Sequence, residues 1–200
     1  MGRKYDFELL LMRHGEARGW SDEGDRGRAL TENGRDRIKD SVGAFESLGW
    51  HWGLGATSGY TRAQETYDTL LHSMYDRALA DHHVKLPEAS EVPDLAPSGD
   101  PERAARALIG IGENLAGPQP RVLAVAHNPI LPAVAGVLLA GDPSLQLALG
   151  TGDVIHLFIP APSHFDIVLA PQEQEPLPRA YLLGMYPSHA LAAIAAQAAK

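Results

Sequence analysis

The chain has 200 residues, of which 44% are hydrophobic and 21% charged, and its formal net charge is −8. This length and apolar content suit one domain with its own core and exclude disorder as a description of the whole chain. The acidic balance argues against nucleic acids and anionic membranes as partners, because their phosphates are bound by a basic excess. The chain has no cysteine, which excludes a disulfide framework, a thiolate zinc site and a cysteine nucleophile.

The sequence predicts a cytoplasmic protein. The first apolar stretch, residues 7–12, is shorter than the hydrophobic region of an export signal and is interrupted by Glu8. The lack of cysteine also fits a reducing compartment. Residues 122–141 carry no charge and have the length of a membrane span, but a histidine, an asparagine and two prolines interrupt them. We therefore expect a buried strand, a polar turn and a buried helix there, and no membrane as a partner.

Strand and helix signals alternate along the chain. Short apolar runs predict strands at 7–12, 54–57, 84–86, 122–126, 154–159 and 165–169. Apolar residues at helical spacing predict helices over 31–48, 63–74, 100–115 and 130–140, and another from about 187. Thr31 and Asp100 are the predicted N-caps of the first and third helices. Residues 171–178 are expected to form a surface loop.

This alternation predicts an α/β fold, a three-layer sandwich with a mostly parallel central sheet and helices on both faces. We expect residues 1–200 to form a single domain, with 170–200 as a C-terminal extension packed on it. Ligands of such sheets bind at the carboxyl ends of the strands. His14 follows the first predicted strand and His127 follows the strand at 122–126, so both are expected at that edge.

The first candidate motif is Arg13-His14-Gly15. A glycine lets the backbone approach a ligand closely, and an arginine offers a planar fork of donors for phosphate or carboxylate. A neutral histidine is able to attack phosphorus through one ring nitrogen while the other is held by a hydrogen bond. Alone, the motif also fits a strand end with a solvated histidine and arginine.

Two further turns carry candidate residues. In Ser58-Gly59-Tyr60-Thr61-Arg62, the arginine falls near the start of a predicted helix, where the backbone donors favour anions. Alone, Arg62 also fits a surface arginine paired with Glu65 or Asp68. The second turn is Ala126-His127-Asn128-Pro129, and a lone histidine at such a place is more often structural than catalytic.

Together these pieces resemble the histidine phosphatase superfamily, which has the phosphoglycerate mutase-like fold. Members carry Arg-His-Gly after the first strand, a Ser-x-x-x-Arg-Ala-x-x-Thr stretch, and a second histidine after a late strand. This chain matches them with Arg13-His14-Gly15, with Ser58 to Thr66, and with His127. Its Arg28-Ala29-Leu30-Thr31 also resembles the segment that opens the family's first helix. The resemblance spans about residues 7–160.

The resemblance implies a catalytic mechanism. His14 is expected to be the nucleophile and to form a phosphohistidine intermediate. Arg13, Arg62 and His127 are expected to surround the phosphoryl oxygens as three cationic donors, with Gly15 also at the substrate. These charges replace a metal ion, so no metal and no cofactor are expected. Ser58 and Asn128 are candidate neutral donors.

Residues 86–100 resemble the corresponding loop of small bacterial phosphohistidine phosphatases, which act on a histidine phosphotransfer domain. We therefore expect a phosphorylated substrate of that kind, with a sugar phosphate or similar metabolite as the alternative. Larger members use a glutamate as general acid, and Asp94 is the nearest candidate here. Gly59 replaces the proline that commonly follows the motif serine. The oligomeric state and the role of the C-terminal extension stay open.

Two other classes compete with this interpretation. The first is a metal-dependent hydrolase that uses His82 and His83 beside Asp81, although adjacent residues point in different directions and no known metal-binding spacing is present. The second is a catalytically inactive module on the same fold that binds a phosphorylated ligand.

Overall fold

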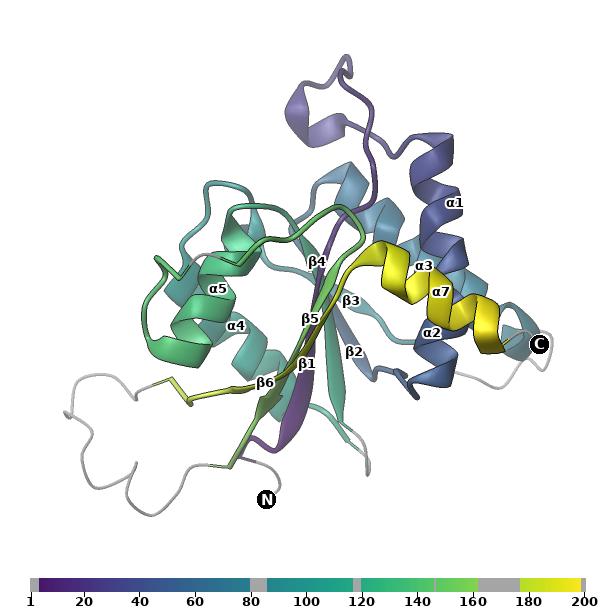
Figure 1. The fold of residues 1–200 in the computed structure, drawn as a ribbon. Helices are drawn as coiled ribbons and strands as arrows, with labels where there is room; N and C mark the ends of the chain where they lie inside the picture. The colour runs from purple at the N-terminus through teal and green to yellow at the C-terminus, as the bar shows by residue number, and fades with distance from the viewer. Residues whose placement is uncertain (1–3, 80–85, 117–119, 146, 162–176, 199–200) are drawn as a thin grey trace, which may run out of the picture.

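A computed structural model describes residues 4–79, 86–116, 120–145, 147–161 and 177–198. Its centre is a six-stranded sheet in the order β3-β2-β4-β1-β5-β6 (Figure 1). The strands are β1 (Phe7–Arg13), β2 (Leu54–Thr57), β3 (Ala89–Glu91), β4 (Arg121–Ala126), β5 (Val154–Ile159) and β6 (Tyr181–Tyr186). Strands β1 to β4 are parallel, β5 is antiparallel to β1, and β6 is antiparallel to β5. Five of the six strands therefore run in one direction, which confirms the predicted mostly parallel α/β sheet.

Helices cover both faces of the sheet (Figure 1). One layer contains α4 (Pro101–Glu113) and α5 (Ile130–Ala140); the other contains α1 (Glu32–Asp40), α2 (Val42–Ser47), α3 (Thr61–Leu79) and α7 (Ser188–Ala198). Alternate residues of β1 pack against the two helix layers, because successive side chains of a strand point to opposite faces. Leu9 and Leu11 pack toward α4 and α5, whereas Leu10 and Met12 pack toward α3 and α7.

The predicted helix over 31–48 is two helices, which is a correction. Thr31 caps α1 as predicted, with its Oγ1 accepting a hydrogen bond from the Gly34 N–H at 2.9 Å. The break comes at Ser41, whose hydroxyl donates to the Ile38 carbonyl oxygen at 2.7 Å. A serine that bonds its own backbone competes with the helix ladder, and here it separates α1 from α2. Asp100 caps α4 in the predicted way, accepting from the Arg103 N–H at 2.9 Å.

Three strand predictions need comment. Residues 84 and 85 lie outside the described residues, and Leu86 is not in a strand; the strand of this region is β3, which pairs with β2. The strand predicted at 165–169 also lies outside the described residues. Strand β6 was not predicted, because its side chains are mostly exposed and show no alternation of apolar and polar residues. It adds an edge to the sheet, and α7 then packs beside α2 (Figure 1).

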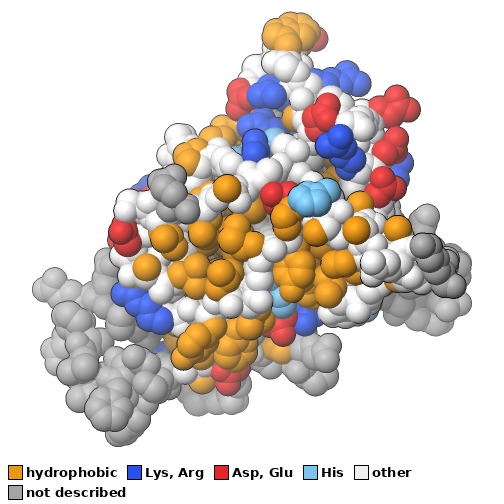
Figure 2. Space-filling model, in the orientation of Figure 1, with side chains coloured by type: hydrophobic (Ala, Val, Ile, Leu, Met, Phe, Trp, Pro, Cys, Tyr) orange, Lys and Arg blue, Asp and Glu red, His pale blue; other side chains and the backbone are white. Residues whose placement is uncertain are grey.

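The stretch that matched a membrane span in length is β4 followed by α5. Among the described residues, no helix combines the length and apolar character needed to cross a membrane. On the face shown in Figure 2, apolar side chains gather over α5 and β6, and charged side chains crowd the end of the molecule where η1 (Asp25–Gly27) and α1 lie. That charged end is also the end at which β1 and β4 finish.

Candidate active site

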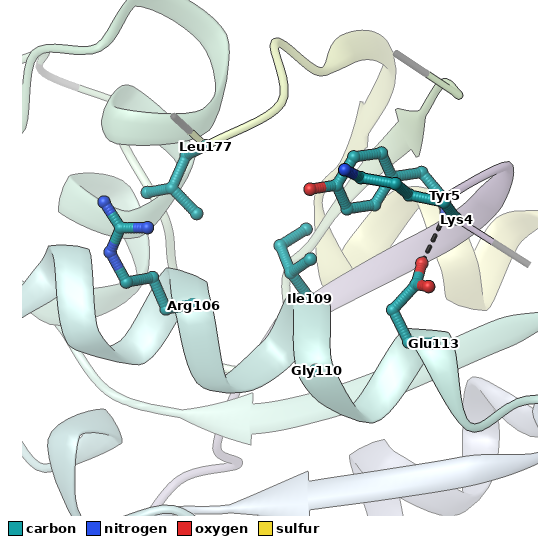
Figure 3. Close-up of a pocket in the computed structure, with 7 residues that line it drawn as sticks. All are labelled: Lys4, Tyr5, Arg106, Ile109, Gly110, Glu113 and Leu177. Carbon is teal, nitrogen blue, oxygen red and sulfur yellow. Dashed lines mark hydrogen bonds between the residues drawn. The ribbon is translucent and has the colours of Figure 1, made fainter. Parts of the chain in front are cut away.

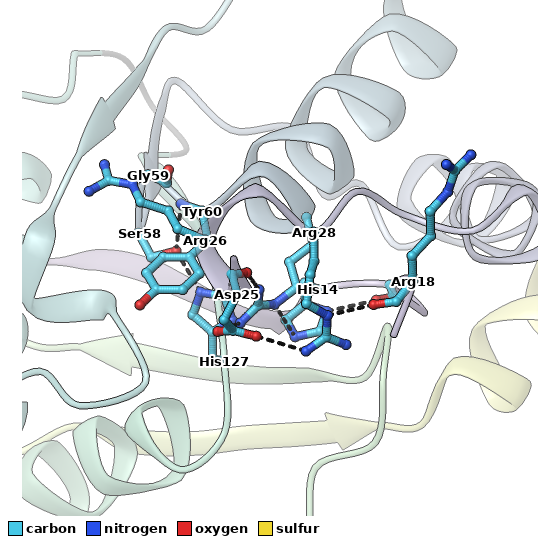
Figure 4. Close-up of polar contacts among 11 residues, drawn as sticks. His14, Arg18, Asp25, Arg26, Arg28, Ser58, Gly59, Tyr60 and His127 are labelled. Atoms are coloured by element: carbon cyan, nitrogen blue, oxygen red, sulfur yellow. Dashed lines mark hydrogen bonds and ion pairs between the residues drawn. The ribbon is translucent and has the colours of Figure 1, made fainter. Parts of the chain in front are cut away.

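The carboxyl ends of four parallel strands meet at one edge of the sheet. Arg13 is level with Ala126, and Thr57 is level with both Val125 and Glu91. The residues that follow these strands are therefore neighbours. The His14 and His127 rings lie with their centroids 5.0 Å apart and their planes at 58°. The two histidines predicted from sequence share one site (Figure 4).

His14 is only 9% exposed. Its Nδ1 lies 2.7 Å from the Gly15 carbonyl oxygen, which accepts but cannot donate, so Nδ1 carries the proton and Nε2 carries the lone pair. Arg62 Nε donates to that Nε2 at 3.2 Å. Burial, reinforced by the nearby Arg62, lowers the pKa of His14 to about 4. The ring is therefore neutral at pH 7, the form that a histidine nucleophile needs.

Gly15 joins this loop to α3. Its N–H donates to Thr66 Oγ1 at 3.0 Å, and that hydroxyl donates to the Arg62 carbonyl oxygen at 2.6 Å. A Cβ on Gly15 would lie 3.2 Å from Ile38 Cγ1 and 3.3 Å from the Gly34 carbonyl oxygen. The close packing around Gly15 thus fixes the positions of His14 and Arg62 relative to each other.

His127 is 1% exposed, and its Nε2 lies 2.6 Å from Ser58 Oγ. Burial lowers the pKa of His127 to about 3, with the neighbouring His14 contributing in the same direction. His127 is therefore neutral in the ligand-free protein, whereas the expectation of a cationic donor concerns the site with a phosphoryl group bound. When the Ser58 hydroxyl donates to Nε2, the ring proton lies on Nδ1. That buried Nδ1 has no hydrogen-bond partner among the described residues, and it is a free donor for an anion.

Arg62 is 4% exposed and lies in the first turn of α3. The Tyr60 ring packs against its guanidinium, with Cζ 4.8 Å from the ring centroid, and the same ring meets His127 edge-on. Arg62 does not pair with Glu65 or Asp68, the alternative left open from sequence. Its partner is Asp25. Both carboxylate oxygens of Glu65 instead accept hydrogen bonds from Arg35 Nη2, each at 2.9 Å.

One donor of the Arg13 guanidinium is bound by the protein itself. Its Nη1 donates to the Leu149 carbonyl oxygen at 2.8 Å, and its buried Nε has no hydrogen-bond partner within the described residues. Asn128 Nδ2 donates to the same carbonyl oxygen at 2.8 Å. One N–H of the Asn128 amide, which we considered as a donor for the substrate, is thus used by the loop before β5, whereas the buried Nε–H of Arg13 is a donor without a partner in the described residues.

Asp94, the candidate general acid, lies in η2 (Pro93–Leu95). Its Oδ1 binds Arg103 at 3.2 Å and accepts from the Asp100 N–H at 3.4 Å. This carboxylate therefore binds groups at the start of α4.

Sequence reasoning assigned no role to Asp25, Arg26, Tyr60 and Glu91, whereas Thr66 was already part of the matched motif. Asp25 and Arg26 belong to the short η1 helix, within a polar segment that has no periodicity. Asp25 Oδ1 accepts from Arg28 Nη1 at 2.8 Å, and Arg28 is the first residue of the Arg-Ala-Leu-Thr match. That motif was the one signal that pointed to this segment.

The described residues contain no cluster of three or more histidine, aspartate or glutamate side chains suited to a metal ion. His82 and His83 lie outside the described residues. A cavity of about 440 Å³ opens elsewhere, at the amino end of β1, whereas His14 follows the carboxyl end (Figure 3). It is lined by Lys4, Tyr5, Arg106, Ile109, Gly110, Glu113 and Leu177.

Comparison with family models finds no match, and neither does comparison with curated proteins. Solved structures do match. The protein histidine phosphatase SixA, solved with tungstate, aligns with a TM-score of 0.69 over 92% of this chain and 99% of its own, at 19% identity. The chain has the histidine phosphatase fold. This confirms the fold that the motif resemblance implied.

Two further structures with this fold show its range. Bacillus stearothermophilus YhfR aligns with a TM-score of 0.54, 18% identity and 89% of this chain against 96% of its own. A mycobacterial glucosyl-3-phosphoglycerate phosphatase aligns with a TM-score of 0.50, 20% identity and 76% of this chain against 90% of its own. Structures with this fold thus include one named as a protein histidine phosphatase and one named as a glucosyl-3-phosphoglycerate phosphatase.

Proposed function

We propose that this protein is a metal-independent phosphatase with His14 as its nucleophile. The observation that carries the proposal is the neutral His14 ring, whose Nδ1 proton is held by the Gly15 carbonyl and whose Nε2 lies 3.2 Å from Arg62 Nε. Nε2 attacks phosphorus, the bond from phosphorus to the leaving group breaks, and the leaving group takes up a proton. Water then attacks the phosphohistidine, which releases phosphate and restores neutral His14.

The donors around His14 suit a phosphoryl group. Arg62 supplies a full charge in a buried place, where electrostatic stabilisation of developing charge is strongest. His127 Nδ1 and Arg13 Nε are buried donors with no partner in the described part of the chain. Three equatorial phosphoryl oxygens would satisfy such donors.

The proposed substrate is a phosphohistidine in a protein, such as a histidine phosphotransfer domain, and the proposed location is the cytoplasm. Two observations support the substrate. The nearest sequence candidate for a general acid, Asp94, is bound to Arg103. A phosphoramidate leaves as a nitrogen that protonates readily, so it needs a strong acid less than an alkoxide does. The SixA structure also aligns with a TM-score of 0.69, against 0.50 for the glucosyl-3-phosphoglycerate phosphatase. The competing substrate is a small phosphomonoester such as a sugar phosphate.

The first test is hydrolysis of an aryl phosphate in excess EDTA, with the wild type compared with His14→Ala and Arg62→Ala. We expect turnover that survives EDTA, vanishes in His14→Ala and falls by about two to three orders of magnitude in Arg62→Ala, because an oxyanion donor contributes about 3 kcal/mol. Phosphate binding without turnover would favour a binding module, and loss of activity in EDTA would favour a metal enzyme.

The second test addresses the substrate. The wild type is given a phosphorylated histidine phosphotransfer domain and a panel of phosphorylated metabolites, and kcat/KM is measured for each. The proposal predicts the highest kcat/KM for the protein substrate. A far higher value for any metabolite would assign the enzyme to the small-molecule class.

A further inference from the structure

The guanidinium of Arg62 is already bound on the edge that faces His14. Nε and Nη2 share one edge of the planar group, the edge that binds two oxygens at once. Nε donates to His14 Nε2 at 3.2 Å, and Nη2 lies 3.1 Å from Asp25 Oδ2. Nη1 donates to the Asp25 backbone carbonyl at 2.6 Å. A phosphoryl group on His14 Nε2 needs this same edge.

Asp25 therefore holds a carboxylate where a phosphoryl oxygen would bind. Its other oxygen accepts from Arg28 Nη1 at 2.8 Å, so the carboxylate bridges two arginines beside the nucleophile (Figure 4). The hydrogen bond from Arg28 holds the pKa of Asp25 below its usual range, and the group is an anion at neutral pH. The Asp25 side chain is 55% exposed, so it has room to move out into solvent when it leaves Arg62.

We propose that Asp25 is a specificity-determining residue that occupies the phosphoryl subsite of the empty protein and must be displaced by the substrate. This inference rests on the proposed function. A terminal phosphoryl group brings about two negative charges and three acceptor oxygens, against one charge and two oxygens for the carboxylate. Phosphomonoesters and phosphoramidates displace Asp25, whereas anions of single charge, such as phosphodiesters and carboxylates, gain too little to do so.

Arg26 holds η1, and with it Asp25, in this position. Its Nη2 lies 2.8 Å from Glu91 Oε1, at the end of β3, and its Nε donates to the Gly59 carbonyl oxygen at 3.3 Å. These contacts tie η1 to the turn between β2 and α3. The Arg26 and Glu91 side chains are 63% and 48% exposed, and ion pairs so exposed are weak. The contact between η1 and this turn is therefore weak enough to open. Arg26 is a positioning residue.

The test is calorimetric titration with inorganic phosphate at pH 8, where phosphate is mostly a dianion. Asp25→Asn keeps the size of the side chain and removes its charge. We expect phosphate to bind about tenfold more tightly, because a like charge near the anion is gone. Asp22→Asn removes the same charge from an exposed neighbour on the same loop, and its effect is expected to stay within about twofold at 0.15 M salt.

Dimethyl phosphate, with its single charge, tests the selectivity. The ratio of its Kd to that of phosphate is expected to fall in Asp25→Asn, because the carboxylate no longer excludes weaker anions. Arg26→Ala supplies a second route, since it releases η1 and leaves Asp25 intact; we expect phosphate binding about threefold tighter, as suits a weak ion pair. Exchanging the two charges, with Arg26→Glu and Glu91→Arg together, is expected to move the Kd back toward the wild-type value, but not fully, because a glutamate at position 26 does not donate to the Gly59 carbonyl.

Weaker or unchanged phosphate binding in Asp25→Asn would overturn the inference; weaker binding would mean that Asp25 serves to hold Arg62 in place. Arg62→Ala separates this failure from failure of the proposed function. If Arg62→Ala abolishes phosphate binding while Asp25→Asn leaves it unchanged, only the inference is wrong. If the wild type and Asp25→Asn both fail to bind phosphate, or Arg62→Ala binds it normally, the phosphoryl site itself is wrong.

Discussion

Ser58 Oγ and His127 Nε2 lie 2.6 Å apart, and both side chains are buried. The hydrogen bond joins the residue after β2 to the residue after β4. It fixes the orientation of the imidazole and leaves Nδ1, the other ring nitrogen, as the buried atom without a partner in the described residues. The Tyr60 ring meets His127 at a centroid distance of 4.8 Å and closes a second side of it. His127 is thus held from two directions by one turn.

Ser58→Ala removes the hydrogen bond between Ser58 and His127. We expect kcat to fall about tenfold, because the ring loses its orientation toward the phosphoryl group, while KM changes less. Unfolding free energy is expected to fall by about 1–3 kcal/mol, since Nε2 becomes a buried group without a partner. Steady-state kinetics and urea unfolding measure the two effects. Ser90→Ala, on the exposed strand β3, is the matched control. Unchanged kcat in Ser58→Ala would show that this hydrogen bond does not position His127.

The two site histidines are expected to stay neutral in acid. Burial lowers the pKa of His14 to about 4 and that of His127 to about 3, against about 6.5 for an exposed imidazole. NMR titration of the ligand-free protein measures both, with the signals assigned from His14→Ala and His127→Ala. Midpoints near 6.5 for either ring would contradict the neutral nucleophile and the neutral donor described above.

The same shifts predict that stability falls with acid. The folded pKa values lie below the unfolded value, so the contribution is complete above pH 6.5 and is lost as pH falls toward 4. Each histidine that is protonated only when unfolded contributes up to about 1.4 kcal/mol per pH unit, and because the unfolded imidazole is only half-protonated at pH 6.5, the pair predicts a loss of about 3 kcal/mol between pH 6.5 and 5. Urea unfolding at the two pH values measures it. His14→Asn is expected to have roughly half this dependence, and an equal slope in wild type and variant would refute the assignment.

The sequence predicted the strands and helices that carry the motifs, because buried parallel strands are continuous apolar runs and their caps are local. It predicted that His14, Arg62 and His127 would share one edge, because the carboxyl ends of parallel strands meet there. It did not predict β6, an exposed edge strand whose partner β5 lies in a distant segment and whose apolar residues do not alternate.

The sequence could not assign the charge states of the site or its inner partners. The neutral form of His127 follows from its depth and from His14 beside it, which are properties of the assembled fold. Asp25 lies in a polar segment without periodicity, and its pairing with Arg62 depends on the path of η1 across the end of β2. Asp94 was the nearest sequence candidate for a general acid, but its carboxylate binds Arg103, one turn into α4.

Gly59 offers a test of how tightly η1 is held. Its φ is +75°, which proline cannot adopt, so the glycine in place of the family's proline fits this turn. A Cβ here would lie 2.2 Å from Glu91 Oε1 and 2.9 Å from Arg26 Nη2. We expect Gly59→Ala to cost about 1–3 kcal/mol of unfolding free energy, part from the positive φ and part from displacing the Arg26–Glu91 pair. In a Glu91→Ala background the steric part disappears and the substitution should cost less. Urea unfolding of the four proteins of this double-mutant cycle measures the difference, and an equal cost in both backgrounds would show that Glu91 does not cover Gly59 in solution.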